Sequence, residues 1–284
     1  MTTKVTREKG GFWVGFAAAV FYPAIRLFSR NEFRGGDRLP REGGALVVFN
    51  HISEIDPVYD AVAVHSAGRV PRFMAKHSLW KVPVVGSLLR GAGQIPVYRG
   101  SGNAQRSLRA AVEGLGAGKV VVIYPEGTVG RDPERWPMYS KTGVARLALD
   151  TDVPVIPAVN WGTHEVHDYQ TKKFRPSPRR RRVVVEFGEP VDLDAYRGRP
   201  RDAALLREVT DAVMSGVRDL LGSVRNETPP VAFHRPGGRS GTDSAASDGD
   251  AAGSATDPVD GAADAATDAE RRPGKDGDSP VERA

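Results

Sequence analysis

The apolar residues of this chain come in short continuous runs that alternate with segments of helical spacing. Five runs rich in Val and Ile lie at residues 45–49, 94–98, 120–124, 153–159 and 183–187. Because these runs are continuous instead of alternating with polar residues, they predict strands that are covered on both faces. The order of strand, helix and strand is typical of an α/β fold, with a mainly parallel or mixed sheet flanked by helices.

Three segments carry apolar residues every three or four positions and predict helices that pack on this sheet. They lie at residues 101–115, 142–149 and about 202–221. In the last of them Leu205, Val209 and Val213 share one face, and charged residues occupy the other. The sequence contains no internal repeat, no Gly-rich phosphate loop and no cluster of zinc ligands.

Residues 11–28, near the start of the chain, form an apolar segment that follows three basic residues. A helix needs about 20 apolar residues to span a bilayer core, whereas this run has 18 residues and includes Pro23 and Arg26. We predict that residues 1–30 form a membrane-associated helical segment, one helix or two hinged at Pro23, that lies in one leaflet. A spanning helix, a core-packing helix and a cleaved secretory signal are the alternatives.

Two further segments have the composition of surfaces that contact lipid. Residues 77–89 combine a Trp and a Lys with apolar residues, which suits a membrane-facing loop and equally a part of the core. The basic run at residues 179–182 precedes the last predicted strand. Such a run suits contact with anionic headgroups or simple exposure to solvent.

The composition changes at Asn226, after which large apolar residues are almost absent. We predict a disordered acidic tail at residues 226–284, because such a segment cannot bury enough surface to offset its ordering entropy. The α/β domain then covers residues 31–225. The tail has 12 acidic and 6 basic residues and the whole chain carries +5, so residues 1–225 carry +11. This charge favours an anionic partner, either a phosphate-bearing substrate, an anionic membrane surface or nucleic acid.

The chain has no cysteine, which excludes disulfides, thiolate metal sites and a cysteine nucleophile. Candidate chemistry lies instead at the strand ends, where ligands of parallel sheets gather. The first strand runs into His51, and Asp56 follows five residues later. A carboxylate bonded to one imidazole nitrogen leaves the other nitrogen as a base. Since Ser53 lies in no GxSxG elbow, a base acting on a substrate hydroxyl is the simpler hypothesis.

The spacing of His51 and Asp56 by itself also fits a structural role. Asp56 would then cap a helix, and His51 would be a hydrogen-bonded loop residue. Four motifs together favour the hypothesis that His51 acts as a base. They occur in the order NHISEIDP (50–57), GQIPVYR (93–99), YPEGT (124–128) and VPVIPA (153–158).

These four motifs resemble those of the 1-acyl-sn-glycerol-3-phosphate acyltransferase family, over about residues 31–190. The resemblance implies an enzyme that transfers a fatty acyl group from acyl-CoA or acyl carrier protein to the free sn-2 hydroxyl of 1-acylglycerol 3-phosphate, giving phosphatidic acid. It implies a membrane surface as partner, at the cytoplasmic face of the cell membrane. A bound cofactor, a metal and a nucleic-acid partner are not expected.

The resemblance also implies roles for individual residues. His51 matches the general base and Asp56 the residue that orients it. A further pattern, KxxLxxxPxxG, is met at residues 76–86. Five residues match positions that bind the acceptor and its phosphate, namely Lys76, Arg99, Glu126, Gly127 and Thr128.

One position departs from the family pattern. Members of that family usually continue EGTRS, and the arginine contacts the phosphate of the acceptor. This chain has Val129 in place of that arginine. Arg131 or Lys141 is the candidate for the missing charge. The acceptor therefore stays open, with glycerol 3-phosphate or another lysophospholipid as alternatives. A non-catalytic basic module that binds membranes or nucleic acid is the alternative of a different class, although it does not explain the polar residues at successive strand ends.

Overall fold

The computed structural model describes residues 8–98, 101–175, 177 and 179–235. The described strands are β1 (Ser29–Arg34), β2 (Ala45–Phe49), β3 (Pro71–Lys76), β4 (Ile95–Val97), β5 (Val120–Ile123), β6 (Val155–Trp161), β7 (His167–Asp168), β8 (Lys173–Phe174) and β9 (Arg181–Phe187). The described α-helices are α1 (Gly11–Phe28), α2 (Asp56–Ser66), α3 (Val85–Gly91), α4 (Ser101–Gly116), α5 (Gly143–Asp150), α6 (Thr163–Val166) and α7 (Ala203–Arg225). The short 3₁₀ helices are η1 (Gly36–Arg38), η2 (His77–Lys81) and η3 (Asp194–Tyr196).

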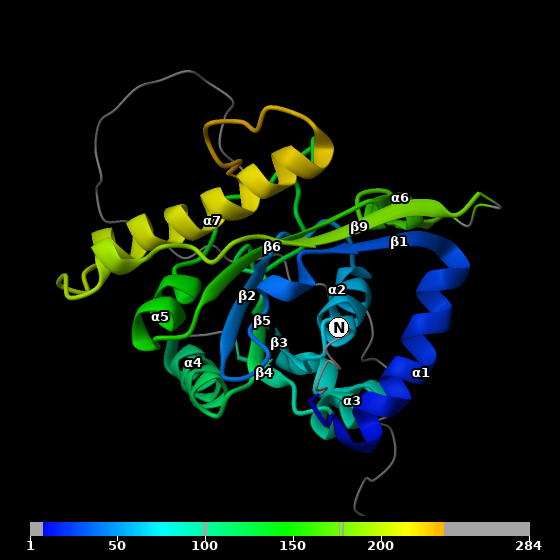
Figure 1. Cartoon of the computed structure of the whole chain (residues 1–284), viewed down its shortest axis with the longest axis horizontal. Coiled ribbons are helices and arrows are strands. Elements are labelled where there is room, and N and C mark those ends of the chain that lie inside the picture. The colour runs from blue at the N-terminus through cyan, green and yellow to red at the C-terminus, as the bar shows by residue number, and fades with distance from the viewer. Residues whose placement is uncertain (1–7, 99–100, 176, 178, 236–284) are drawn as a thin grey trace, which may run out of the picture. The chain divides into compact units, whose positions relative to one another are not determined.

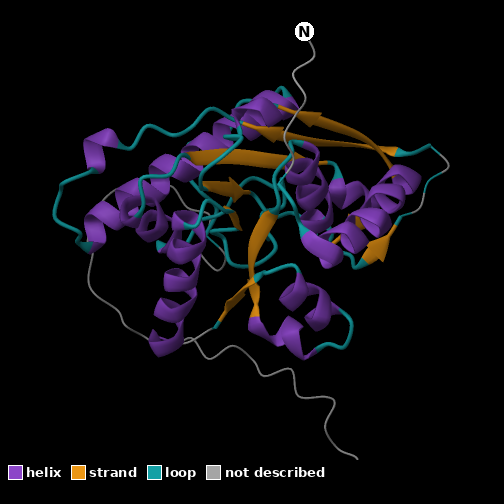
Figure 2. Cartoon of the chain, turned by 60° about the horizontal axis from the view of Figure 1, so that its bottom comes forward, coloured by secondary structure: helices purple, strands orange, loops and turns teal. Residues whose placement is uncertain are grey.

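The centre of the fold is a seven-stranded sheet in the order β1-β9-β6-β2-β5-β3-β4 (Figure 1). Neighbouring strands run parallel except β6 and β9, which are antiparallel. Strands β7 and β8 pair separately. The predicted α/β class with a mainly parallel or mixed sheet is confirmed, and Figure 2 shows helices on both sides of the strands.

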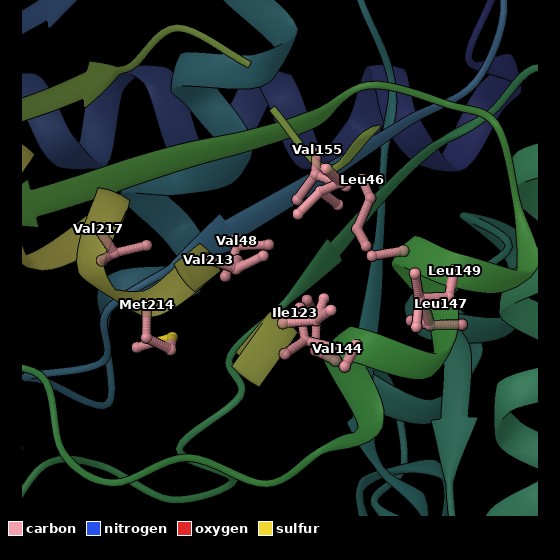
Figure 3. Packing of buried hydrophobic residues seen from close by; sticks show 14 of the residues in the cluster. Leu46, Val48, Ile123, Val144, Leu147, Leu149, Val155, Val213, Met214 and Val217 are labelled. Atoms are coloured by element: carbon pink, nitrogen blue, oxygen red, sulfur yellow. The ribbon is translucent and has the colours of Figure 1, made fainter. Parts of the chain in front are cut away.

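Helices α4, α5 and α7 cover one face of the sheet, and α1 and α2 cover the other (Figure 1). On β2, Leu46 and Val48 join the hydrophobic cluster of the first face, whereas Val47 and Phe49 join that of the second. Successive side chains of a strand point to opposite faces, so a strand buried on both faces has a continuous apolar run. Figure 3 shows Leu46 and Val48 among residues of α5 and α7.

Strands β1 and β3 were not predicted from the sequence. Strand β1 reads SRNEFR and lies at the sheet edge, where Glu32 forms ion pairs with Arg34 and Arg182. Strand β3 reads PRFMAK and alternates between buried and partly exposed side chains over its first four residues. Neither has the continuous apolar run that identifies a strand covered on both faces.

The apolar segment near the N-terminus forms one continuous helix, α1, that passes through Pro23. By length and composition α1 could cross a membrane, and only 11% of it is buried. It contacts α2 and α3. Ile25 of α1 is buried in the core, as the core-packing alternative predicts, whereas Phe12 is 77% exposed and Leu27 is also exposed. Helix α1 therefore packs on the core and also presents an uncovered apolar face.

The ordered chain continues past the predicted boundary at residue 226. Helix α7 ends at Arg225, and the left-handed backbone of the next residue, Asn226 (φ 56°), caps it. The chain then returns, because Phe233 packs against the core under the guanidinium of Arg218, and the carbonyl of His234 accepts the N–H of Tyr139 (2.9 Å). Residues 226–235 therefore belong to the folded part. Residues 236–284 lie outside the described residues, so the tail stays a prediction there.

Replacing Phe233 by Ala should lower the free energy of unfolding by about 2 kcal/mol, because a partly buried aromatic ring leaves the core. Denaturant unfolding of the full chain measures this. Val231→Ala is the matched control, since Val231 is 95% exposed two residues away and should change stability by less than about 0.5 kcal/mol. Equal effects of the two substitutions would show that residues 226–235 do not pack on the core.

Candidate active site

His51 and Asp56 face each other across the turn between β2 and α2. Nδ1 of His51 lies 2.9 Å from Oδ2 of Asp56. The same oxygen accepts the backbone N–H groups of Ile52 (2.6 Å) and Ser53 (2.8 Å). The Asp56 side chain is fully buried, and 15% of the His51 side chain is exposed. Asp56 thus organises the turn and orients the ring at once, and the bond at Nδ1 leaves Nε2 of His51 as the nitrogen that can act as a base.

The second oxygen of Asp56 has its own donor from a distant part of the chain. Oδ1 accepts the hydroxyl of Thr163 at 2.5 Å. Thr163 begins α6, directly after Gly162, whose φ of 100° only glycine adopts readily. A Cβ at Gly162 would also collide with the carbonyl of Arg182. The turn at Gly162 therefore delivers Thr163 to the carboxylate, a role that no local motif of the sequence indicates.

Two asparagines join the ends of β2 and β6 beside this turn. The side-chain amide of Asn50 donates to the carbonyl of Asn160 (3.1 Å), and its oxygen accepts the Asn160 N–H (2.9 Å). Both residues are fully buried. The amide of Asn160 also lies 3.3 Å from Oδ2 of Asp60. These bonds fix the strand end from which His51 follows.

The imidazole of His51 rests on Tyr124, the residue that follows β5. The ring centroids are 4.3 Å apart and the rings are nearly parallel, at 21°. The Tyr124 hydroxyl donates to Oδ2 of Asp60 at 2.6 Å, and Asp60 lies one helical turn after Asp56 with no exposed surface. Burial, together with the nearby Asp56, raises the pKa of Asp60 well above its usual value. Tyr124 and Asp60 were not predicted as site residues.

The loop after β5 holds the backbone of His51. Oε1 of Glu126 accepts the His51 N–H (3.0 Å), Oε2 accepts the Met138 N–H (3.2 Å), and the Gly130 N–H donates to the His51 carbonyl (2.7 Å). Burial raises the pKa of Glu126 to about 8, although the two backbone bonds act to lower it. The contacts of Glu126 in the structure are with the protein backbone, and its predicted part in acceptor binding stays a prediction.

Gly127, Thr128 and Arg131 also belong to this loop, and Lys141 reaches it from further along the chain. Gly127 has a φ of 70°, and a Cβ there would lie 3.3 Å from Cε and Nζ of Lys141. The ammonium group of Lys141 is therefore beside the turn, whereas Arg131 is exposed and Thr128 partly buried. Val129 is 7% exposed and points into the protein. Of the two candidate cations, Lys141 is the one that lies beside Gly127.

Lys76 ends β3 and is exposed. It pairs in register with Val97 of β4, and β3 also pairs with β5. Because all three strands run parallel, Lys76 lies on the same sheet edge as the turn at Glu126. Arg99 follows β4 but lies outside the described residues.

Among the described residues, no group of three or more His, Asp or Glu side chains could hold a metal ion.

Comparisons with known proteins agree with this geometry. The sequence profile of the family described as Acyltransferase matches residues 30–161, which include His51, Asp56 and Glu126. An uncharacterized protein of Mycobacterium tuberculosis is 26% identical over 261 residues, covering 78% of this chain and 70% of that protein.

Two proteins named as acyltransferases are also similar. The 1-acyl-sn-glycerol-3-phosphate acyltransferase of Limnanthes douglasii is 29% identical over 154 residues, covering 54% of this chain and 52% of that protein. The crystal structure of the 1-acyl-sn-glycerophosphate (LPA) acyltransferase PlsC from Thermotoga maritima superposes with a TM-score of 0.53 at 27% identity, covering 73% of this chain and 79% of PlsC.

The pKa of Glu126 predicts a pH effect on stability. In the unfolded chain this carboxyl has its ordinary pKa of 4.5, so the folded protein binds the proton more tightly and gains stability from it below that pH. This stability is lost as the pH rises toward about 8. The difference in unfolding free energy between wild type and Glu126→Gln should shrink by on the order of 2–4 kcal/mol from pH 5 to pH 8, because glutamine does not titrate. Denaturant unfolding at both pH values measures it, with the exposed Glu134→Gln as control for loss of one carboxyl; a pH-independent difference would contradict it.

Replacing Tyr124 by Phe should keep the ring under His51 and remove the donor to Asp60. A buried carboxyl that loses its partner costs about 1–3 kcal/mol, so the free energy of unfolding should fall by that amount. Tyr139→Phe is the matched control, because Tyr139 is partly exposed and its hydroxyl makes no hydrogen bond within the described part of the chain. Thermal and denaturant unfolding compare the two, and no loss in Tyr124→Phe would show that the bond to Asp60 is dispensable.

Proposed function

This chain belongs to the acyltransferase family, and from that premise we propose that it is a membrane-associated O-acyltransferase acting on a glycerolipid. The proposed reaction transfers a fatty acyl group from acyl-CoA or acyl carrier protein to the free sn-2 hydroxyl of 1-acylglycerol 3-phosphate, and the product is phosphatidic acid. The observation that carries the proposal is the pairing of partly exposed His51 with fully buried Asp56.

In the proposed mechanism, Nε2 of His51 takes the proton of the acceptor hydroxyl as its oxygen attacks the thioester carbonyl. A C–O ester bond forms, the C–S bond breaks, and the leaving thiolate takes up the proton from the imidazolium. Asp56 holds the ring in the tautomer that leaves Nε2 unprotonated and stabilises the positive charge that develops. General-base catalysis by a positioned side chain is worth about 10²–10⁴ in rate.

Cations on the same sheet edge support an acceptor that carries a phosphate. Lys76 at the end of β3 and Lys141 beside Gly127 are the described candidates. Arg99 would add a bidentate contact, the geometry that suits phosphate. Glycerol 3-phosphate and other lysophospholipids share this chemistry, and they remain the alternative acceptors.

An exposed apolar surface supports the membrane part of the proposal. Trp13 of α1 packs against Gly91, at the end of α3, so closely that a Cβ at Gly91 would meet the indole ring. The two segments therefore adjoin, and both carry exposed apolar side chains. They are Phe12, Phe16, Val20 and Leu27 on α1, and Leu79, Val82, Val84 and Val85 from η2 to the start of α3. Exposed apolar side chains on adjoining segments favour membrane or partner contact. We place the enzyme on the cytoplasmic face of the cell membrane.

The proposal is tested by acyl transfer from labelled acyl-CoA and from acyl carrier protein to lysophosphatidate, glycerol 3-phosphate and lysophosphatidylcholine. His51→Ala should lower the rate on the preferred acceptor by about 10²–10⁴ while leaving the unfolding transition close to that of wild type.

His234→Ala is the matched control, because His234 lies in the returning segment after α7 and pairs with Asp132 at 3.6 Å. It should keep most of the activity. Transfer by His51→Ala at the wild-type rate would refute the mechanism. Transfer to an acceptor other than lysophosphatidate would change the substrate and leave the mechanism standing.

A further inference from the structure

A cleft of about 470 Å³ opens between α1, β1 and α2, away from His51 and its partners. Its apolar floor includes Ile25 and Val62, which are both buried. Three arginines, Arg26, Arg30 and Arg180, line it and are exposed. The volume lies in the range of ordinary ligand sites.

The charges of these three arginines are not neutralised within the described part of the chain. The next two residues after Arg180, by contrast, do form ion pairs. Arg181 pairs with Glu165 (3.8 Å) and Arg182 pairs with Glu32 (2.8 Å). No carboxylate among the described residues lies within ion-pair distance of the three that line the cleft. Arg180 instead donates to the main-chain carbonyl of Arg26 (3.1 Å), which holds its side chain beside α1.

The cleft lies apart from His51 but at the same end of the sheet, the end where β2 and β6 terminate, as the strand registers show. Arg30 pairs with Arg182, whereas the end of β6, Trp161, pairs with Val184. Because β9 runs antiparallel to β6, the starts of β1 and β9 extend beyond the carboxyl end of β6. The carbonyl of Arg182 also lies against Gly162, the residue before the Thr163 that binds Asp56.

We propose that this cleft binds the phosphate headgroup of an anionic bilayer phospholipid. Guanidinium groups match phosphate oxygens with paired hydrogen bonds. The helix that forms one wall, α1, exposes Phe16, Val20 and Leu27 along its length, so the lipid chains would continue into the layer that α1 enters. The headgroup would fix the sheet edge with His51 against the membrane. The lipid acts here as an anchor, and the site does not depend on acyl transfer.

The test measures binding of the full chain to vesicles of phosphatidylcholine with and without phosphatidylglycerol. The variant Arg30→Gln/Arg180→Gln leaves α1 unchanged and should weaken binding to the anionic vesicles by about 10- to 30-fold, with no change on neutral vesicles. Arg109→Gln/Arg146→Gln removes the same charge from α4 and α5 on the opposite face and should bind like wild type. Phe12→Ser/Phe16→Ser should weaken binding to both kinds of vesicle, because it acts on α1 itself.

A finer pair separates the cleft from a diffuse positive field. Arg180 lines the cleft and Arg179 does not, although both are exposed neighbours. Arg180→Gln should therefore weaken anionic binding several-fold more than Arg179→Gln. Equal effects of these two, or wild-type binding by Arg30→Gln/Arg180→Gln, would overturn the proposal. Saturable binding of inorganic phosphate that these arginine substitutions abolish, without any change in vesicle binding, would assign the cleft to free phosphate instead.

Discussion

The buried carboxylate of Asp56 is the interaction on which the arrangement of the site depends. A carboxylate removed from water is stable only where donors replace its hydration. Asp56 has such donors from its own turn, from the His51 ring and from Thr163. Its place as the first residue of α2 adds the favourable end of the helix dipole. One charge thereby ties the end of β2, the start of α2 and the start of α6 to a single point.

The imidazole is fixed from several independent directions as a result. Asp56 sets its rotation, Tyr124 covers one face of the ring, and Glu126 with Gly130 holds its backbone on both sides. If His51 is the base, as proposed, a ring held this way loses little entropy on meeting a substrate, which is how positioned groups contribute to rate. Glu126 acts on His51 through the main chain, because its carboxyl group accepts the His51 backbone N–H.

The sequence predicted the parts of this site that are encoded locally. His51 and Asp56 lie five residues apart, and both strand and turn leave a local pattern there. Thr163 and Asn160 could not be found in this way, because each meets its partner across 100 or more residues of chain. Strand β1 was missed because a polar edge strand lacks the apolar run, and residues 226–235 because the single ring of Phe233 anchors an otherwise polar segment.

The buried Val129 bears on what the site can distinguish. Under the proposed function, an arginine at this position would present a planar fork to the acceptor phosphate, whereas this chain has the ammonium of Lys141 beside Gly127. An ammonium is a point charge with freely rotating donors, so it selects less by the geometry of the phosphate than a planar guanidinium does. Discrimination between acceptors would then rest on the space around His51 and on the other cations of the edge. A site of this kind is expected to accept a wider range of headgroups than one closed by an arginine fork.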